Sequence, residues 1–338
     1  MRRRAVVGML ALMPPLVAVM ARSRRASAAP AAPHLVTDYR TSSPLFADRD
    51  RLYWVARDAI LSVSKRGGEP TPAVTGNVDP LALFGDRLVF EERPPDAGSS
   101  LEPRSLIKSC RTGDPRTVTT LATGRSMIHG ATADASGVYF HEQQDSEFML
   151  LFHLPWSGGK ARELAEVSNE PGGLLADATH LYWGSIGGAI YAVPKQGGVP
   201  EVVGHGQSST GAVAVDEHSV YFTNTEAGTL SRAPKRGGQT VKLATARKSV
   251  APYDVGLHGQ LDAVVLHGAH VYYVDNDIYA RVAAVRRVPK TGGRAETVVE
   301  RPGCTIEDLV TDGKLWFWVE KIEKNGAKDR FPIMSLPL

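Results

Sequence analysis

The sequence predicts an all-β fold, a seven-bladed β-propeller, and two observations support this. First, an apolar–aromatic motif recurs seven times, at intervals of 36 to 51 residues. Its copies are Leu52-Tyr53-Trp54, Leu88-Val89-Phe90, Val138-Tyr139-Phe140, Leu181-Tyr182-Trp183, Val220-Tyr221-Phe222, Val271-Tyr272-Tyr273 and Leu315-Trp316-Phe317. Second, turn residues flank these motifs, and helical periodicity of any length is absent. A unit of about 40–45 residues with four short strands is typical of one propeller blade.

Each repeat predicts four strands, which follow one another in the same order. A short apolar stretch comes first, followed by a turn that contains aspartate in six copies, at 48, 86, 134, 177, 216 and 312. The aromatic motif is the second strand, because β-branched and aromatic residues favour strands. A third strand ends in a basic-x-Gly turn such as Pro234-Lys235-Arg236-Gly237-Gly238, and a short fourth strand such as 241–244 follows.

The two ends of the chain predict how the ring closes. The seventh repeat stops after its third strand, near 333–336, while a spare strand-like segment, 34–38, precedes the first repeat. We expect this N-terminal strand to complete the last blade, which leaves no open edge between the first and last blades. Residues 34–338 are therefore predicted to form a single domain.

Residues 1–28 have the plan of a secretory signal peptide: Arg2-Arg3-Arg4, an apolar run over 5–21, and Ala26-Ser27-Ala28 as a cleavage site. Residues 29–33 are a short linker. The pattern favours the general secretory route over the twin-arginine route, and it predicts a periplasmic or extracellular protein. An uncleaved anchor is the alternative, but Pro14-Pro15 interrupts the apolar run. No later segment is long and apolar enough to span a membrane.

The chain has a net charge of +3, and its positive sign is due to the predicted export signal. Residues 1–28 contain six arginines and no acidic residue, so the remaining chain has a net charge of −3. Without a clustered basic stripe, nucleic acid is not an expected partner. The two cysteines exclude a disulfide scaffold. Cys110 falls on the third strand of blade two and Cys304 just before the inner strand of blade seven, so we expect no disulfide between them.

Several motifs resemble a known group. Tyr53-Trp54, Tyr182-Trp183 and 221–224 (Tyr-Phe-Thr-Asn) look like the YWTD repeat, and with the Pro-Lys-x-Gly-Gly turns the chain resembles secreted bacterial propellers of the broad YWTD/TolB-like/NHL group. This resemblance implies a scaffold, a binding module or, occasionally, an enzyme. The Thr-Asp half of the repeat is mostly absent, for example at Val55-Ala56 and Gly184-Ser185, so no receptor-type ligand specificity is carried over.

Candidate ligand-binding residues come from one repeat position. Propellers bind ligands at the mouth of the central channel, where inner strands begin. The position nine residues before each aromatic motif, with a one-residue shorter turn in blade seven, holds Ser43, Asp79, His129, Gly172, Gly211, Asp262 and Glu307. Asp79, Asp262 and Glu307 could hold a hard cation such as calcium, or act with His129 in acid–base chemistry. Alternatively, these are solvated residues that each cap their own turn.

Two further features are open to more than one interpretation. The loop over 247–260 contains Tyr253, Asp254 and His258, which could line a pocket rim or belong to a solvent-facing insertion. The lysines and arginines of the basic turns are predicted to lie on one face, where they could attract an anionic surface or simply keep hairpin tips soluble.

These observations lead to one main functional hypothesis and one alternative. The main hypothesis is an exported, non-enzymatic and monomeric propeller that recognises a protein, a small molecule or a glycan. It needs no cofactor, although a calcium ion could bind at Asp79, Asp262 and Glu307. The alternative is a metal-dependent lyase or lactonase with its site at the channel mouth. G-x-S-x-G, H-E-x-x-H, Walker and C-x-x-C motifs are absent from the sequence.

Overall fold

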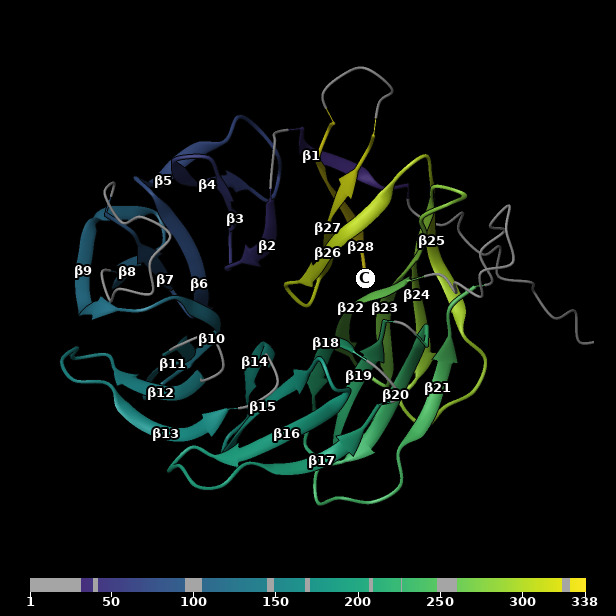
Figure 1. Ribbon diagram of the computed structural model, residues 1–338. Coiled ribbons are helices and arrows are strands. Elements are labelled where there is room, and N and C mark those ends of the chain that lie inside the picture. The colour runs from purple at the N-terminus through teal and green to yellow at the C-terminus, as the bar shows by residue number, and fades with distance from the viewer. Residues whose placement is uncertain are drawn as a thin grey trace, which may run out of the picture. The chain divides into compact units, whose positions relative to one another are not determined.

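In a computed structural model, the strands that the structure describes form seven antiparallel four-stranded sheets. The structure describes residues 32–38, 42–94, 105–144, 149–167, 171–206, 209–225, 227–247, 260–323 and 329–338. The chain divides into two compact units, Met1–Ala32 and Pro33–Leu338, and every strand lies in the second. Each sheet is one blade, and the seven blades form a ring (Figure 1). The predicted fold is confirmed.

The first four blades follow the repeats of the sequence. Blade 1 holds β2 (Ser42–Ala47), β3 (Arg51–Ala56), β4 (Ala59–Ser64) and β5 (Thr71–Thr75). Blade 2 holds β6 (Val78–Phe84), β7 (Arg87–Glu92), β8 (Ser105–Arg111) and β9 (Asp114–Arg125). Blade 3 holds β10 (Ile128–Asp134), β11 (Gly137–Gln143), β12 (Met149–Pro155) and β13 (Arg162–Val167). Blade 4 holds β14 (Pro171–Ala176), β15 (His180–Ser185), β16 (Ala189–Pro194) and β17 (Glu201–His205).

The remaining three blades complete the ring. Blade 5 holds β18 (Thr210–Val215), β19 (Ser219–Asn224), β20 (Thr229–Pro234) and β21 (Val241–Thr245). Blade 6 holds β22 (Gln260–His267), β23 (His270–Asp277), β24 (Val282–Pro289) and β25 (Glu296–Pro302). Blade 7 holds β26 (Thr305–Thr311), β27 (Leu315–Lys321), β28 (Pro332–Pro337) and, as its fourth strand, β1 (His34–Asp38).

Strand β1 closes the ring as predicted. It pairs antiparallel with β28, so that His34 faces Ser335 and Leu35 faces Met334. Its Val36 is buried in a core cluster that also contains Ile333 of β28. The first and last strands of the propeller are therefore held in one sheet, and unfolding either end exposes the core of blade 7.

The aromatic motifs form the packing between blades. Tyr53, Trp54, Phe90, Phe140, Trp183 and Phe222 are among the largest fully buried side chains. The hydrophobic clusters each combine residues of neighbouring blades, for example Tyr182 and Ile190 of blade 4 with Val220 and Phe222 of blade 5. A blade is thus covered on both faces by its neighbours, which explains why its second strand is a continuous apolar run.

The aspartate turn between the first and second strands has a repeated geometry. In blade 4, Asp177 Oδ1 accepts hydrogen bonds from the backbone N–H groups of Thr179 and His180, and Asp177 Oδ2 accepts one from the Tyr182 hydroxyl at 2.8 Å. Blade 1 repeats this with Asp48 and Tyr53 at 2.8 Å. The aspartate therefore closes its own turn and orients the aromatic side chain five residues later.

In the fourth strand of every blade, one residue interrupts the register at an equivalent place, and β9 has two further irregularities. These bulged residues are Val36, Ala73, Leu121, Leu164, Val203, Leu243 and Val298. In blade 3 the Leu164 carbonyl accepts a hydrogen bond from Gly198 N–H of blade 4 at 3.0 Å. A Cβ on Gly197, which has φ +95°, would lie 2.8 Å from that carbonyl oxygen. The glycines of the turn are thus required for the hairpin of one blade to dock on the bulge of the preceding blade.

Both cysteines are buried free thiols. Cys110 lies on β8 and Cys304 directly precedes β26, as predicted. The described part of the chain contains no helix that is long and apolar enough to cross a membrane.

Candidate functional site

The register gives Asp79, His129, Asp262 and Glu307 equivalent positions in their blades. Asp79 directly follows Val78, whose partner is Glu92 at the end of the second strand of blade 2. His129, Asp262 and Glu307 follow Ile128, Leu261 and Ile306, whose partners are Glu142, Asp275 and Glu320. Each of the four therefore lies near the start of an inner strand, and blades 4 and 5 have Gly172 and Gly211 at the same place.

Asp79 and His129 are held by neighbours in their own blades. The Asp79 carboxylate lies 3.3 Å from Nη2 of Arg93, which also pairs with the buried carboxylate of Glu91 at 2.8 Å. The His129 Nε2 atom lies 3.1 Å from the side-chain oxygen of Gln143. These contacts neutralise or satisfy both side chains within blades 2 and 3.

Asp262 has a different environment, because amide groups rather than cations surround it. Its carboxylate accepts hydrogen bonds from Gln260 Nε2 at 2.9 Å and Asn276 Nδ2 at 3.0 Å. Burial raises the pKa of Asp262, and these two hydrogen bonds only partly offset that effect. Asn276 is itself buried and also bonds the backbone of Ile306, so it connects blade 6 to blade 7 beside Asp262.

Glu307 lies within electrostatic reach of Asp262. Burial raises the pKa of Glu307, Lys321 lowers it, and the negative charges of Asp262 and Asp308 raise it further. Asp262 and Glu307 are thus two acidic groups on adjacent inner strands whose surroundings disfavour their charged forms. A ligand that donates hydrogen bonds or carries positive charge would relieve this penalty.

The three carboxylates do not come together as a metal centre. Within the described ranges, no group of three or more His, Cys, Asp or Glu side chains lies in an arrangement that could hold a metal ion. Tyr253, Asp254 and His258, the other predicted candidates, lie outside the described residues.

At the same end of the strands, buried acids pair with arginines across blade boundaries. Asp275 is fully buried and lies 3.2 Å from Nε of Arg247, which follows the last strand of blade 5. Glu320 of blade 7 pairs with Arg301 of blade 6 at 2.5 Å, and Glu142 of blade 3 pairs with Arg125 of blade 2. These acids therefore join blades, whereas Asp262 and Glu307 form no ion pair with an arginine or a lysine in the described part of the chain.

The opposite end of the strands carries a second set of ion pairs, which sequence reasoning did not find. A lysine in the turn after the third strand of one blade pairs with the turn aspartate of the preceding blade. The four pairs are Lys65–Asp312 at 2.8 Å, Lys195–Asp134 at 2.5 Å, Lys235–Asp177 at 2.6 Å and Lys290–Asp216 at 3.1 Å. Each ammonium also lies 5.0 to 6.0 Å from the centre of an aromatic ring of that preceding blade. These turn lysines thus serve to join blades rather than to form an open basic rim.

Two of the remaining interfaces replace both members of the pair. Between blades 2 and 3, Phe84 stands in the aspartate position and Trp156 in the lysine position, and their rings stack with centres 6.4 Å apart. Between blades 6 and 7, His267 takes the aspartate position and contacts the Trp316 ring edge-on at 6.3 Å. Aromatic contact therefore substitutes for the ion pair at these two interfaces.

The interface between blades 1 and 2 keeps the aspartate but has lost the lysine. Asp48 and Tyr53 are present in blade 1, but the register places Thr112 of blade 2 where blades 1, 4, 5 and 6 have lysine. The loop that contains Thr112 has two residues between β8 and β9, whereas six residues separate the corresponding strands of blades 1, 3, 4, 5 and 6. The bulged residue of blade 1 is Ala73, the smallest of the seven.

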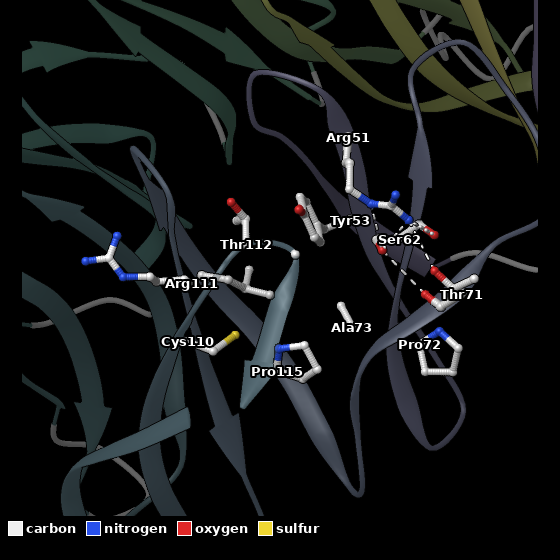
Figure 2. A pocket seen from close by; sticks show the side chains of 12 residues that line it. Arg51, Tyr53, Ser62, Thr71, Pro72, Ala73, Cys110, Arg111, Thr112 and Pro115 are labelled. Atoms are coloured by element: carbon white, nitrogen blue, oxygen red, sulfur yellow. Dashed lines mark hydrogen bonds between the residues drawn. The ribbon is translucent and has the colours of Figure 1, made fainter. Parts of the chain in front are cut away.

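A pocket of about 160 Å³ occupies this interface (Figure 2). Tyr53 and Thr112 lie on one side of it, and Ala73, Cys110 and Pro115 lie on another. Arg51 lines a third side, where its guanidinium donates hydrogen bonds to Ser62 and Thr71. A second cavity of about 320 Å³ shares Pro72, Ala73 and Pro115 with the first. A small side chain at the bulge and a short loop therefore coincide with two cavities that share part of their wall.

Comparison with known proteins supports the fold but identifies no family. No family model and no curated protein matches the chain. Among solved structures, the RRP9 WD40 repeats match with a TM-score of 0.65 and 14% identity over 92% of this chain and 99% of that chain. YCF48 bound to the D1 peptide matches with a TM-score of 0.62 and 9% identity over 92% and 96% of the two chains.

A third similar structure is an enzyme variant. A catalytically inactive virginiamycin B lyase from Staphylococcus aureus, with quinupristin, matches with a TM-score of 0.57 and 14% identity over 90% of this chain and 98% of that chain. At such low sequence identities these similarities support a shared fold and nothing about function. The chain is thus similar in fold to proteins of several kinds, so these likenesses assign it no function.

Proposed function

We propose that this chain is an exported, non-enzymatic β-propeller that recognises a protein or small-molecule ligand at the mouth of its central channel. One observation carries the proposal: Asp262 and Glu307 lie near each other on adjacent inner strands, in surroundings that raise the pKa of both carboxyl groups. Asp262 is half-buried and Glu307 is exposed, so a ligand that is positively charged or donates hydrogen bonds can reach both carboxyl groups and stabilise their charged forms.

The distribution of the other buried charges supports recognition over catalysis. Asp275, Glu142 and Glu320 are paired with arginines of the preceding blade, and four turn aspartates are paired with lysines. These groups hold the ring together and are not free for acid–base chemistry. Propellers related in architecture include one bound to a peptide, which is consistent with a role for the present chain as a protein-binding module.

A site-specific photo-crosslinker at position 307 tests the proposal in cells that produce the protein. We expect a discrete adduct that disappears when Asp262→Asn is introduced in the same chain. The matched control carries the crosslinker at Arg66, an exposed turn residue at the other end of the strands, and should give no such adduct. An adduct at position 307 that survives Asp262→Asn, or no adduct at all, would contradict recognition at the mouth.

Export rests on residues 1–28, which lie outside the described residues. Fusing residues 1–33 to a reporter enzyme that is active only outside the cytoplasm should give activity, and replacing the apolar run should abolish it. Changing both Arg3 and Arg4 to lysine should leave export unchanged if the general secretory route is used. Loss of export in that variant would instead favour the twin-arginine route.

A further inference from the structure

The pocket between blades 1 and 2 lies where a longer turn contacts the preceding blade at other interfaces. Gly159 N–H of blade 3 donates a hydrogen bond to the Leu121 carbonyl of blade 2, and Gly198 N–H of blade 4 donates one to the Leu164 carbonyl of blade 3. Among the described residues, the shorter loop of blade 2 donates no such bond to Ala73 of blade 1. A short loop and a bulged side chain of one methyl group therefore border the open volume of about 160 Å³.

The charged side chains that line this pocket are both cationic. They are Arg51 and Arg111, and the described lining contains no aspartate or glutamate. The Asp48 carboxylate does not line the pocket, and it is bound by the Tyr53 hydroxyl and by backbone N–H groups of its own turn. The sign of the lining therefore fits an anion and disfavours a cation.

Arg51 has a positive charge without an ion-pair partner in the described part of the chain. Its half-buried guanidinium donates to neutral oxygens only: Nε and Nη2 bond the Ser62 hydroxyl at 3.1 and 2.9 Å, and Nη2 also bonds the Ser62 carbonyl and the Thr71 hydroxyl. These bonds hold the guanidinium beside Ser62 and Thr71 (Figure 2). They leave Nη1 without an acceptor among the described residues, so a bound carboxylate would gain a charge-assisted hydrogen bond there.

The remaining walls of the pocket have different properties. Arg111 is already paired, with Nη1 2.6 Å from the Asp86 carboxylate, and its guanidinium points away from the other labelled side chains in Figure 2. Away from Arg51 the lining is mostly apolar, and it includes Ala73, Leu88 and Pro115. The pocket thus combines one cationic end with a compact apolar interior.

We propose that this pocket binds a small monocarboxylate, with the acid group at Arg51 and a compact apolar group against Ala73, Leu88 and Pro115. A cavity of about 150 Å³ can hold a benzene ring, so the volume of about 160 Å³ suits an apolar group of that size. The pocket lies at the opposite end of the strands from Asp262 and Glu307, so the proposal does not depend on recognition at the channel mouth.

Titration of the purified chain with benzoate, followed by NMR, tests the proposal. We expect saturable shifts of resonances from Ala73 and Thr112, and no saturable shifts with benzylammonium or with the neutral benzyl alcohol. Arg51→Gln should weaken benzoate binding by about tenfold or more, because it removes the charged hydrogen-bond donor. The matched control is Arg66→Gln, which changes an exposed arginine of blade 1 outside the pocket and should leave the affinity unchanged.

Filling the pocket provides a second variant that should preserve the fold. Blades 2, 3 and 5 have leucine at the bulge where blade 1 has Ala73, namely Leu121, Leu164 and Leu243. Ala73→Leu should therefore abolish benzoate binding without lowering the melting temperature. Benzoate binding that persists in Ala73→Leu, or benzyl alcohol binding as tightly as benzoate, would overturn the proposal. The Ala73→Leu result decides the question even if Arg51→Gln fails to fold.

A further titration distinguishes the two sources of the carboxylate. Nα-acetyl-phenylalanine presents the group as the C-terminus of a protein does, whereas benzoate presents it as a free acid. Tighter binding of Nα-acetyl-phenylalanine would identify a partner's C-terminus as the ligand, and equal or tighter binding of benzoate would identify a free acid. If neither compound binds, the pocket is not a carboxylate site.

Discussion

The ammonium of Lys235 in blade 5 lies 2.6 Å from the carboxylate of Asp177 in blade 4. Only 11% of the lysine side chain and 22% of the aspartate side chain are exposed, so both charges are largely removed from water. The aspartate also closes its own turn and orients Tyr182, so one side chain links the turn, the aromatic motif and the neighbouring blade. Three other interfaces repeat this arrangement, which makes it a structural element of the ring.

Replacing Lys235 by methionine should destabilise the protein. The change leaves the Asp177 carboxylate half-buried without its cation, and charged hydrogen bonds of this kind contribute about 1.5–3 kcal/mol. We expect the free energy of unfolding in urea to fall by about that amount. Arg236→Met alters an exposed side chain of the same turn and should have little effect. Equal losses in the two variants would show that the ion pair does not stabilise the interface.

Acid should weaken the same interface. Burial alone would raise the pKa of Asp177, but hydrogen bonds from Lys235, His180 and Thr179 outweigh it, so the pKa lies well below its ordinary value of 3.8. The unfolded chain therefore binds the proton more readily than the folded one, and stability is lost as the pH falls below that value. Denaturation at a series of acidic pH values should show a shallower decline for Lys235→Met than for the unchanged protein. Equal declines in stability with falling pH for the two proteins would contradict a role of the Lys235–Asp177 pair in the acid sensitivity.

His141 should produce a separate loss of stability at mildly acidic pH. The side chain is fully buried against Trp183, and both ring nitrogens lack a hydrogen-bond partner among the described residues. Burial, together with the nearby His129, lowers the pKa of His141 from 6.5 to about 3. Since the unfolded chain protonates first, stability should fall as the pH drops from 6.5, by at most about 1.4 kcal/mol per pH unit.

His141→Leu should remove most of this slope between pH 6.5 and 4, as measured by urea denaturation. His218→Gln is the control, because 82% of that side chain is exposed. A His141→Leu variant that retains the full slope would assign the pH dependence to other groups.

Asp262→Asn should stabilise the free protein at neutral pH. The pKa of Asp262 is raised in the folded state, so its contribution to stability is present at low pH and lost as the pH rises through that pKa. An asparagine can keep polar contacts with Gln260 and Asn276 without the buried charge. The melting temperature at pH 7 should therefore rise, while crosslinking from position 307 is lost. A lower melting temperature would indicate that Asp262 is a structural residue and not part of a binding site.

The fold could be predicted because its signals are local and repeated. Each blade needs its own apolar second strand and its own turns, so the pattern of Leu52-Tyr53-Trp54 recurs with every blade. Closure by β1 was also predictable, since the last repeat lacked one strand and the N-terminus had one to spare. Equivalence of Asp79, His129 and Asp262 followed from their common distance of nine residues to the aromatic motifs, and that of Glu307 followed once a one-residue shorter turn was allowed.

The pairing of side chains could not be predicted in the same way. Lys235 and Asp177 are 58 residues apart, and Lys65 and Asp312 are 247 residues apart, so no local pattern connects them. Both residue types were visible in the repeats, but their contact depends on how one blade is rotated against the next. The signal that could have revealed the pocket is the short loop after Arg111. This repeat has threonine at the lysine position, and its loop is four residues shorter than the loops of blades 1, 3, 4, 5 and 6.

Metal analysis of the purified chain most directly tests the central claim of recognition without metal-dependent catalysis. The measurement is the calcium content by mass spectrometry after dialysis, for the unchanged protein and for a variant with Asp79→Ala, Asp262→Ala and Glu307→Ala. We expect far less than one calcium ion per chain, and no difference between the two proteins. One calcium ion per chain that is lost in the variant would contradict this expectation and would favour a metal-dependent lyase or lactonase.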